Sequence, residues 1–169
     1  MFLVGQTCSG KTTLSRILHE HGLEIRSASR TLAKVGQARG HKVDDRSSLS
    51  SLGLELRQSG ELAEFHEELF LNWSGEASIL VDGPRFKETF DYSKRLHPEP
   101  RIVYLHCAEA TRRKRYELTR NSITWEEVNL LETEVSVLEF SPIADLVIDT
   151  TSSDMRAIAW QVVQKLKFN

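Results

Sequence analysis

The chain has 169 residues, of which 40% are hydrophobic and 27% are charged, and its formal net charge is −2 at pH 7. This length and composition are typical of one globular domain with a sizeable core, and the slight negative charge disfavours a surface that coats nucleic acid. The two cysteines, Cys8 and Cys107, form neither a metal-ligand spacing nor a disulfide framework. Because no apolar run has membrane-spanning length and no basic-then-apolar signal is present, we expect a cytoplasmic protein without a membrane partner.

The predicted elements alternate between short apolar strands and amphipathic helices. Strands are expected at 1–5, 23–27, 78–84, 101–107 and 144–150, where apolar runs end in turn residues. Helices are expected at 11–22, 29–40, 48–60, 61–73, 109–120, 124–140 and 153–166, and several of them end in glycine. Strands separated by helices predict an α/β fold with a parallel sheet that is covered on both faces.

The segment between the first strand and the first helix carries the most specific motif. The pattern of a phosphate-binding loop is glycine, any four residues, then Gly-Lys-Ser/Thr, and it is matched by Gly5, Gln6, Thr7, Cys8, Ser9, Gly10, Lys11 and Thr12, with Thr13 next in the helix. Glycine lets the strand turn sharply while successive N–H groups point into one concavity, and the helix N-terminus adds partial positive charge. We expect the Lys11 ammonium to reach the β and γ phosphates and the Thr12 hydroxyl to bind Mg²⁺. The sequence therefore predicts a site for a nucleoside triphosphate.

In "ILVDGPR", Asp82 lies at the carboxyl end of a predicted strand. The residues at this position distinguish the classes of phosphate-loop protein. At the carboxyl end of a strand the Asp82 carboxylate is expected to hold the magnesium ion beside Thr12. The next residue is Gly83 rather than a water-polarising glutamate, which disfavours a motor-type ATPase. The guanine-reading sequence Asn-Lys-x-Asp does not occur in the chain, which disfavours a GTPase switch. The class of activity that remains is phosphoryl transfer to a second substrate. The simpler alternative is that Asp82 and Gly83 only form a turn after a core strand.

Five motifs in order resemble the nucleoside monophosphate kinase-like family of phosphate-loop kinases, in its adenylate kinase-like and dephospho-coenzyme A kinase-like branch. They are "GQTCSGKT", "SASRTLA", "VDGPR", "RRKRYELTR" and "ADLVID". The resemblance implies a three-layer α/β/α fold with a five-stranded parallel sheet in a single domain, 1–169. It also implies a helical acceptor-binding region at about 27–75, a short lid at about 117–140, and transfer of the γ-phosphate of Mg-ATP to a nucleotide or related phosphorylated small molecule.

The resemblance also implies roles for several arginines. In "VDGPR" Arg85 would face the acceptor, and in the Ser-x-x-Arg at 27–30 Arg30 would bind the acceptor's phosphate, because a guanidinium pairs two phosphate oxygens at once. Arginines of the lid region are expected to stabilise the moving phosphoryl group together with Lys11 and Asp82, and the candidates are Arg112, Arg113, Arg115 and Arg120, with Arg115 and Arg120 assigned as catalytic. Alternatively, Arg113 only pairs with Glu117, four residues further along the helix.

Other polar and aromatic residues have structural interpretations. The acidic residues Glu126, Glu127, Glu132 and Glu134 are expected to form a solvated helix face, and Asp44 and Asp45 either orient an acceptor hydroxyl or belong to a polar loop. The aromatic side chains expected to pack in the core rather than to stack on a base are Phe65, Trp73, Trp125 and Trp160, together with Leu69.

Two alternative functions stay open. A kinase acting on hydroxymethylated pyrimidine in DNA would use the arginines at 112–120 along the backbone, although the acidic net charge disfavours nucleic acid as the partner. A nucleotide-dependent switch ATPase without an acceptor is disfavoured by Gly83 and by the missing guanine motif.

Overall fold

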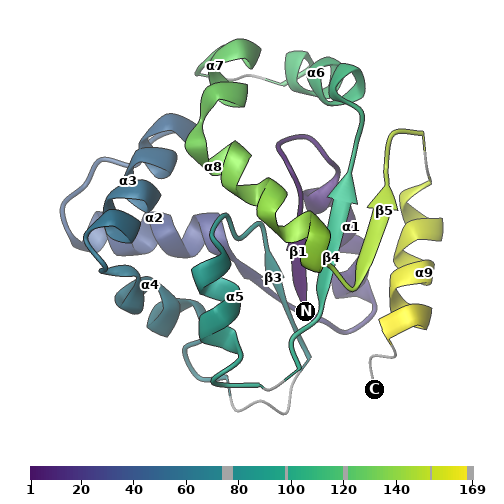
Figure 1. The fold of residues 1–169 in the computed structure, drawn as a ribbon, viewed down its shortest axis with the longest axis horizontal. Helices are drawn as coiled ribbons and strands as arrows, with labels where there is room; N and C mark the ends of the chain where they lie inside the picture. The colour runs from purple at the N-terminus through teal and green to yellow at the C-terminus, as the bar shows by residue number, and fades with distance from the viewer. Residues whose placement is uncertain (74–77, 98, 120–121, 153, 167–169) are drawn as a thin grey trace.

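A five-stranded parallel sheet forms the centre of the molecule (Figure 1) in a computed structural model that describes residues 1–169 except 74–77, 98, 120–121, 153 and 167–169. The strands are β1 (Phe2–Val4), β2 (Glu24–Ser27), β3 (Ile79–Asp82), β4 (Ile102–His106) and β5 (Leu146–Asp149). Their order is β2-β3-β1-β4-β5 and every neighbouring pair is parallel. The predicted α/β fold with a five-stranded parallel sheet is confirmed.

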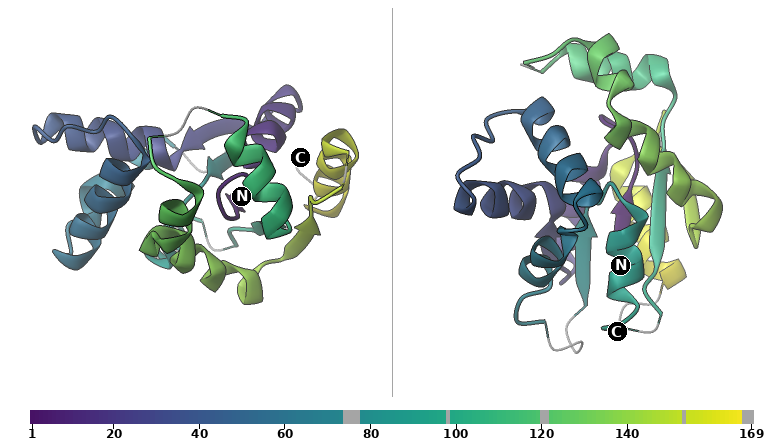
Figure 2. Two further views of the ribbon diagram at one scale, coloured as in Figure 1. Left: turned by 90° about the horizontal axis from the view of Figure 1, so that it is seen from above. Right: turned by 60° about the vertical axis from the view of Figure 1, so that its left-hand side comes forward.

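Helices cover both faces of the sheet, as Figures 1 and 2 show. Because side chains alternate along a strand, Phe2 and Val4 contribute to one core and Leu3 to the other. The core around Leu3 is closed by α1 (Lys11–Glu20) and α9 (Met155–Leu166). The core around Phe2 includes side chains of α5 (Lys87–Ser93) and of the 3₁₀ helix η1 (Val137–Ile143). Burial on both faces explains why the strands are almost continuously apolar.

Three helices between β2 and β3 stand beside the sheet, on the left in Figure 1. They are α2 (Ala28–Ala38), α3 (Arg46–Gln58) and α4 (Leu62–Leu69). The start of α3 is fixed by a capping box, in which the Asp45 carboxylate accepts from the Ser48 N–H at 2.8 Å. Asp45 therefore has a structural role as a helix cap, which agrees with the loop interpretation of this residue.

The predicted helix 124–140 is wrong in its continuity, because the chain forms α7 (Trp125–Leu130), α8 (Glu132–Ser136) and then η1. Leu131 has extended backbone angles (φ −62°, ψ 127°), which end α7 and redirect the chain into α8. These elements follow β4 and α6 (Glu109–Glu117), and the bend at Leu131 carries α8 down from the top of the molecule toward the sheet (Figure 1). The short helix α5 has no counterpart among the predicted elements.

The predicted packing of two tryptophans has opposite outcomes. Trp125 is buried beside Tyr116, with 5.6 Å between the ring centroids, as expected. Trp160 is 61% exposed, so its predicted burial is wrong. The helix α9 packs through Ile158, Ala159 and Val162, and this leaves Trp160 on the outward face. Within the described residues no helix is long and apolar enough to cross a membrane.

The buried side chain of His66 on α4 predicts a pH-dependent stability. Burial lowers the pKa of His66 from 6.5 to about 4, with Arg95 acting in the same direction and Glu88 opposing it. The ring is 3.2 Å from the Thr89 hydroxyl and stacks on Tyr92. Since the unfolded chain binds the extra proton below pH 6.5 and the folded chain does so only near pH 4, stability is complete above pH 6.5 and falls below it.

We expect the free energy of unfolding to lose about 2–3 kcal/mol from this residue between pH 7.5 and pH 4.5. Urea titrations of the wild type and of His66→Gln at both pH values measure it, because glutamine removes the titrating group. An equal pH dependence in the two proteins would contradict the prediction.

Candidate active site

Residues 5–12, here called the phosphate loop, join β1 to α1 in a conformation that depends on glycine. A Cβ on Gly5 would lie only 2.6 Å from the Leu105 carbonyl oxygen of β4, and Gly10 has a left-handed φ of 96° at the N-cap of α1. Side chains that follow β4 and β5 hold the loop's carbonyl groups: Arg115 Nη1 donates to Cys8 O at 3.1 Å, and Thr150 Oγ1 donates to Ser9 O at 2.8 Å. The loop is thus pre-organised, as an anion site made of backbone donors requires.

The side chain of Lys11 contacts the first two residues of the phosphate loop. Its ammonium donates to the carbonyl oxygens of Gly5 and Gln6 at 2.7 and 2.8 Å. Burial lowers the pKa of Lys11 to about 7, Arg85 adds to the effect, and Glu134 and Asp82 oppose it. An anion placed at this ammonium would favour its charged form, so the lysine is suited to a phosphate group.

Asp82 and Thr12 both line the cavity that the phosphate loop borders, and each has a side-chain oxygen. Asp82 is the last residue of β3, next to β1 in the sheet. Burial raises the pKa of its carboxyl group, while Lys11 and a hydrogen bond from Ser15 act against the increase. A carboxylate and a hydroxyl are the donors that Mg²⁺ prefers, so these residues fit the ion.

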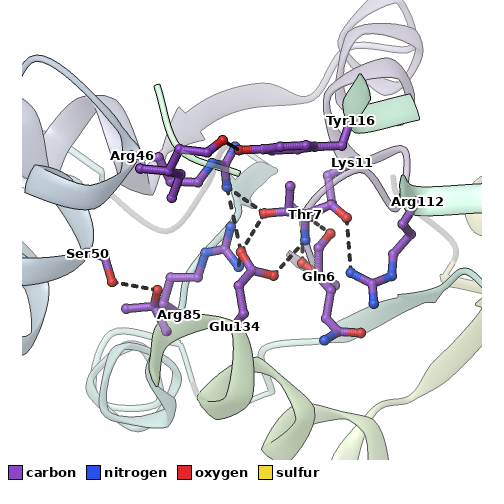
Figure 3. Close-up of polar contacts among 12 residues, drawn as sticks. Gln6, Thr7, Lys11, Arg46, Ser50, Arg85, Arg112, Tyr116 and Glu134 are labelled. Carbon is purple, nitrogen blue, oxygen red and sulfur yellow. Dashed lines mark hydrogen bonds and ion pairs between the residues drawn. The ribbon is translucent and has the colours of Figure 1, made fainter. Parts of the chain in front are cut away.

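Glu134 corrects the sequence prediction of a solvated acidic face. Glu126, Glu127 and Glu132 are exposed as expected, but Glu134 is only 1% exposed. Its Oε2 accepts from the Thr7 N–H at 2.8 Å, and its Oε1 lies 2.9 Å from Arg85 Nη1 (Figure 3). A signal was present in the sequence, because Glu134 stands three residues from both Leu131 and Val137, in a row of apolar residues.

Arg46 is a second site residue that the sequence analysis missed. It is the first residue of α3, and its Nη1 donates to Thr7 Oγ1 at 2.5 Å and lies 3.6 Å from Glu134 Oε1. Figure 3 shows Arg46 and Glu134 approaching Thr7 from different elements, with Arg85 beside Glu134. Burial, and next Arg85, lower the pKa of Arg46. Two guanidinium groups therefore share one buried carboxylate beside the phosphate loop.

The structure brings together most, though not all, of the residues predicted for the site. A cavity of about 740 Å³ is bordered by part of the phosphate loop and, among the other predicted residues, by Thr13, Asp82, Arg85 and Arg115. Arg30 is exposed and does not line the cavity. Its positive charge still acts on Asp82, where it opposes the increase in pKa that burial causes. Arg120 lies outside the described residues.

The other two arginines of α6 differ from each other. Arg112 is buried, its guanidinium lies 5.1 Å from the Trp125 ring centroid, and its Nη1 donates to Thr7 O at 3.5 Å. Arg113 is paired with Glu117 at 2.8 Å on the surface, which agrees with the alternative interpretation of this residue. Arg112 and Arg115 both contact carbonyl groups of the phosphate loop, so α6 supports the loop.

The end of the cavity away from Lys11 is largely apolar. Leu32, Leu49, Leu62, Phe65 and Phe86 line it, from α2, α3, α4 and the segment after β3. Hydroxyl groups interrupt these walls, and the pair Ser50–Thr133 is joined by a hydrogen bond of 2.9 Å. One continuous cavity thus has a charged end at the phosphate loop and an apolar end among the helices that follow β2.

Comparison with protein families gives a match over residues 1–127 to a model described as an AAA domain. A comparison with curated proteins finds no match.

Solved structures resemble the chain over nearly its whole length. A gluconokinase from Sinorhizobium meliloti 1021 is 14% identical with a TM-score of 0.63, and 98% of this chain and 90% of that chain are covered. TT1252 from Thermus thermophilus is 20% identical with a TM-score of 0.67, covering 98% and 96%. Shikimate kinase from Acinetobacter baumannii in complex with shikimate is 17% identical with a TM-score of 0.56, covering 98% and 91%. The predicted phosphate-loop kinase-like fold is confirmed.

Proposed function

The chain belongs to the AAA domain family, and on that premise we propose that it is an ATP-dependent kinase that transfers the γ-phosphate of Mg-ATP to a small-molecule acceptor. The observation that carries the proposal is one continuous cavity that is lined by the phosphate loop, Lys11, Arg46 and Arg85 and also by apolar side chains. A switch ATPase needs only the first part of this cavity, whereas a kinase needs both. The names of similar structures, gluconokinase and shikimate kinase, support the same class of reaction.

Each group in the cavity has a role in such a transfer. The backbone N–H groups of the phosphate loop and the Lys11 ammonium would bind the triphosphate, and Thr12 and Asp82 would hold the metal. Magnesium, when bound, neutralises part of the charge on the β and γ phosphates. Arg85 and Arg46 direct positive charge at the place where the phosphoryl group passes to the acceptor. Arg115, which donates to Cys8 O and at 2.8 Å to Thr150 O, keeps the loop in place.

For the acceptor we propose a nucleotide or a similar phosphorylated metabolite, within the adenylate kinase-like and dephospho-coenzyme A kinase-like branch. The apolar walls around Phe65 and Phe86 are suited to a ring, and the arginine pair is suited to an anionic group. DNA is less well supported as an acceptor, because Arg112 and Arg115 contact the phosphate loop and Arg113 pairs with Glu117. These arginines are thus not arranged to follow a nucleic-acid backbone.

Incubation with magnesium and γ-labelled ATP tests the function. The acceptors to be compared are nucleoside monophosphates, dephospho-coenzyme A, gluconate, shikimate, and plain and hydroxymethylated DNA. We expect magnesium-dependent transfer of label to at least one small molecule and none to DNA, with a chelator as the negative control. Folded protein that transfers label to no small molecule, while it hydrolyses ATP at a rate that no acceptor changes, would contradict the proposal.

A further inference from the structure

We propose that Glu134 is a positioning residue for phosphoryl transfer, which fixes Thr7 of the phosphate loop and holds Arg46 and Arg85 beside it. The inference rests on the proposed kinase function, and it assigns a role to a residue that no motif of the sequence indicates. Glu134 belongs to α8, and it is 127 residues away from Thr7 in the chain.

Both oxygens of the Glu134 carboxylate are used. Oε2 accepts the Thr7 N–H at 2.8 Å, while Oε1 accepts the Thr7 hydroxyl and lies 2.9 Å from Arg85 Nη1 and 3.6 Å from Arg46 Nη1. The same carboxylate therefore joins α8 to the loop after β1, to the segment after β3 and to the start of α3 (Figure 3). All three segments line the cavity.

The surroundings keep the Glu134 carboxylate ionised. Burial alone would raise the pKa of Glu134, but Arg85 and the hydrogen bonds from Thr7 outweigh it and lower the pKa. A general base must accept a proton readily, and a carboxylate with a lowered pKa does not. The oxygens of Glu134 also already accept hydrogen bonds and pair with arginine. Glu134 is therefore not suited to take a proton from an acceptor. Its contribution is to orient other groups.

The charge balance at this point supports that role. Two guanidinium groups face one carboxylate, which leaves one positive charge for an incoming anion. Burying an ionised carboxylate has a large free-energy cost, and good pairing only offsets it. An arrangement of this kind is common where charged groups must be held in a fixed geometry for function. Because both arginines would otherwise sample many rotamers, the carboxylate pre-organises them for the transfer step.

Glu134→Gln tests the inference, with Glu132→Gln as the matched control. Glutamine has nearly the same shape, but its NH₂ group must face either the Thr7 N–H or the arginines, so that a donor meets a donor. Glu132 lies on the same short helix with its side chain 57% exposed. For Glu134→Gln we expect kcat of transfer to fall about tenfold to a hundredfold and the acceptor KM to rise, while the ATP dissociation constant from calorimetry changes less than about threefold. Glu132→Gln should match the wild type in all three.

A double-mutant cycle separates positioning from general stabilisation. If Glu134 acts through the arginine pair, Glu134→Gln should lower kcat by less than about threefold further in a protein in which both Arg46 and Arg85 are already replaced by glutamine. Glu134→Asp keeps the charge and shortens the reach, so we expect a smaller loss of kcat in the same direction. This variant also provides the test if Glu134→Gln does not fold.

Three results would overturn the inference: an unchanged kcat in a folded Glu134 variant, a loss of Tm without any change in kcat or KM, or tighter binding of ATP. The last would mean that the carboxylate occupies the place of a phosphate. A wild-type protein that transfers no phosphate contradicts the proposed function itself, whereas active wild type with equally active Glu134 variants contradicts only the role of Glu134.

Discussion

Replacement of Lys11 by alanine is expected to reduce phosphoryl transfer about a thousandfold or more in kcat/KM. The Lys11 ammonium is the cation that the motif places at the β and γ phosphates. In the structure its hydrogen bonds to Gly5 O and Gln6 O hold it against the loop. Alanine removes this charge in a buried site, where an ion pair is stronger than in water.

The measurement is steady-state transfer of labelled phosphate, together with calorimetry of ATP binding. Lys114→Ala serves as a control, because Lys114 is exposed on α6. Thermal unfolding should change little in Lys11→Ala, since among the described residues its side chain makes two hydrogen bonds, both to carbonyl groups of the loop. A folded Lys11→Ala protein with transfer within tenfold of the wild type would show that the loop does not bind the donor as proposed.

The features that the sequence predicted well are those encoded by neighbouring residues. The phosphate loop follows from the spacing of Gly5, Gly10 and Lys11, and the parallel sheet follows from five short apolar runs with helical segments between them. A Cβ at Gly5 would meet Leu105 O, a contact that explains physically why the motif requires glycine there. Such signals are readable because their cause lies within a few residues or in burial on both faces of a sheet.

The features that the sequence did not predict depend on distant contacts. Glu134 and Arg46 obtain their roles from Thr7, which is 127 and 39 residues away in the chain. The apolar residues three positions before and after Glu134 indicate that its side chain is buried, but nothing near Glu134 or Arg46 in the sequence indicates Thr7 as the partner. The break at Leu131 was hidden for the same reason, since helical periodicity continues across it in the sequence while the chain turns to bring α8 to the loop.

Local signals also mislead where they only describe composition. Trp160 is apolar and lies on an amphipathic helix, yet α9 is covered through Ile158, Ala159 and Val162 and leaves the indole outside. The spacing of Arg113 and Glu117 in the "RRKRYELTR" segment did indicate their pairing, but nothing in this segment indicated that Arg112 is buried. Arg112 is buried by Trp125, whereas Arg113, one residue further on the helix, pairs with Glu117 in solvent.

Loss of Arg85 is expected to affect both stability and activity. Its guanidinium lies 2.9 Å from Glu134 Oε1, and Glu134 is 1% exposed. Arg85→Met leaves this carboxylate with only Arg46, at 3.6 Å, and the Thr7 hydrogen bonds. Breaking a buried ion pair from one side costs about 3–5 kcal/mol, and since Arg46 remains we expect a loss of about 2–4 kcal/mol in the free energy of unfolding. Transfer should fall at least about a hundredfold.

The double variant Arg85→Met/Glu134→Met should separate the two effects. Removing both charges leaves no unpaired carboxylate in the interior, and Arg46, which loses its partner, has a side chain that is 40% exposed to solvent. Apolar side chains of similar size replace a buried pair at little cost, so we expect at least half of the lost stability to return. Transfer should stay as low as in Arg85→Met, because the cation that faces the phosphoryl group is still missing. Urea unfolding and the labelled-phosphate assay on the three proteins decide the matter. If stability and transfer recovered together, Arg85 would act only through the fold; if neither recovered, the Arg85–Glu134 pair would not be the origin of the instability.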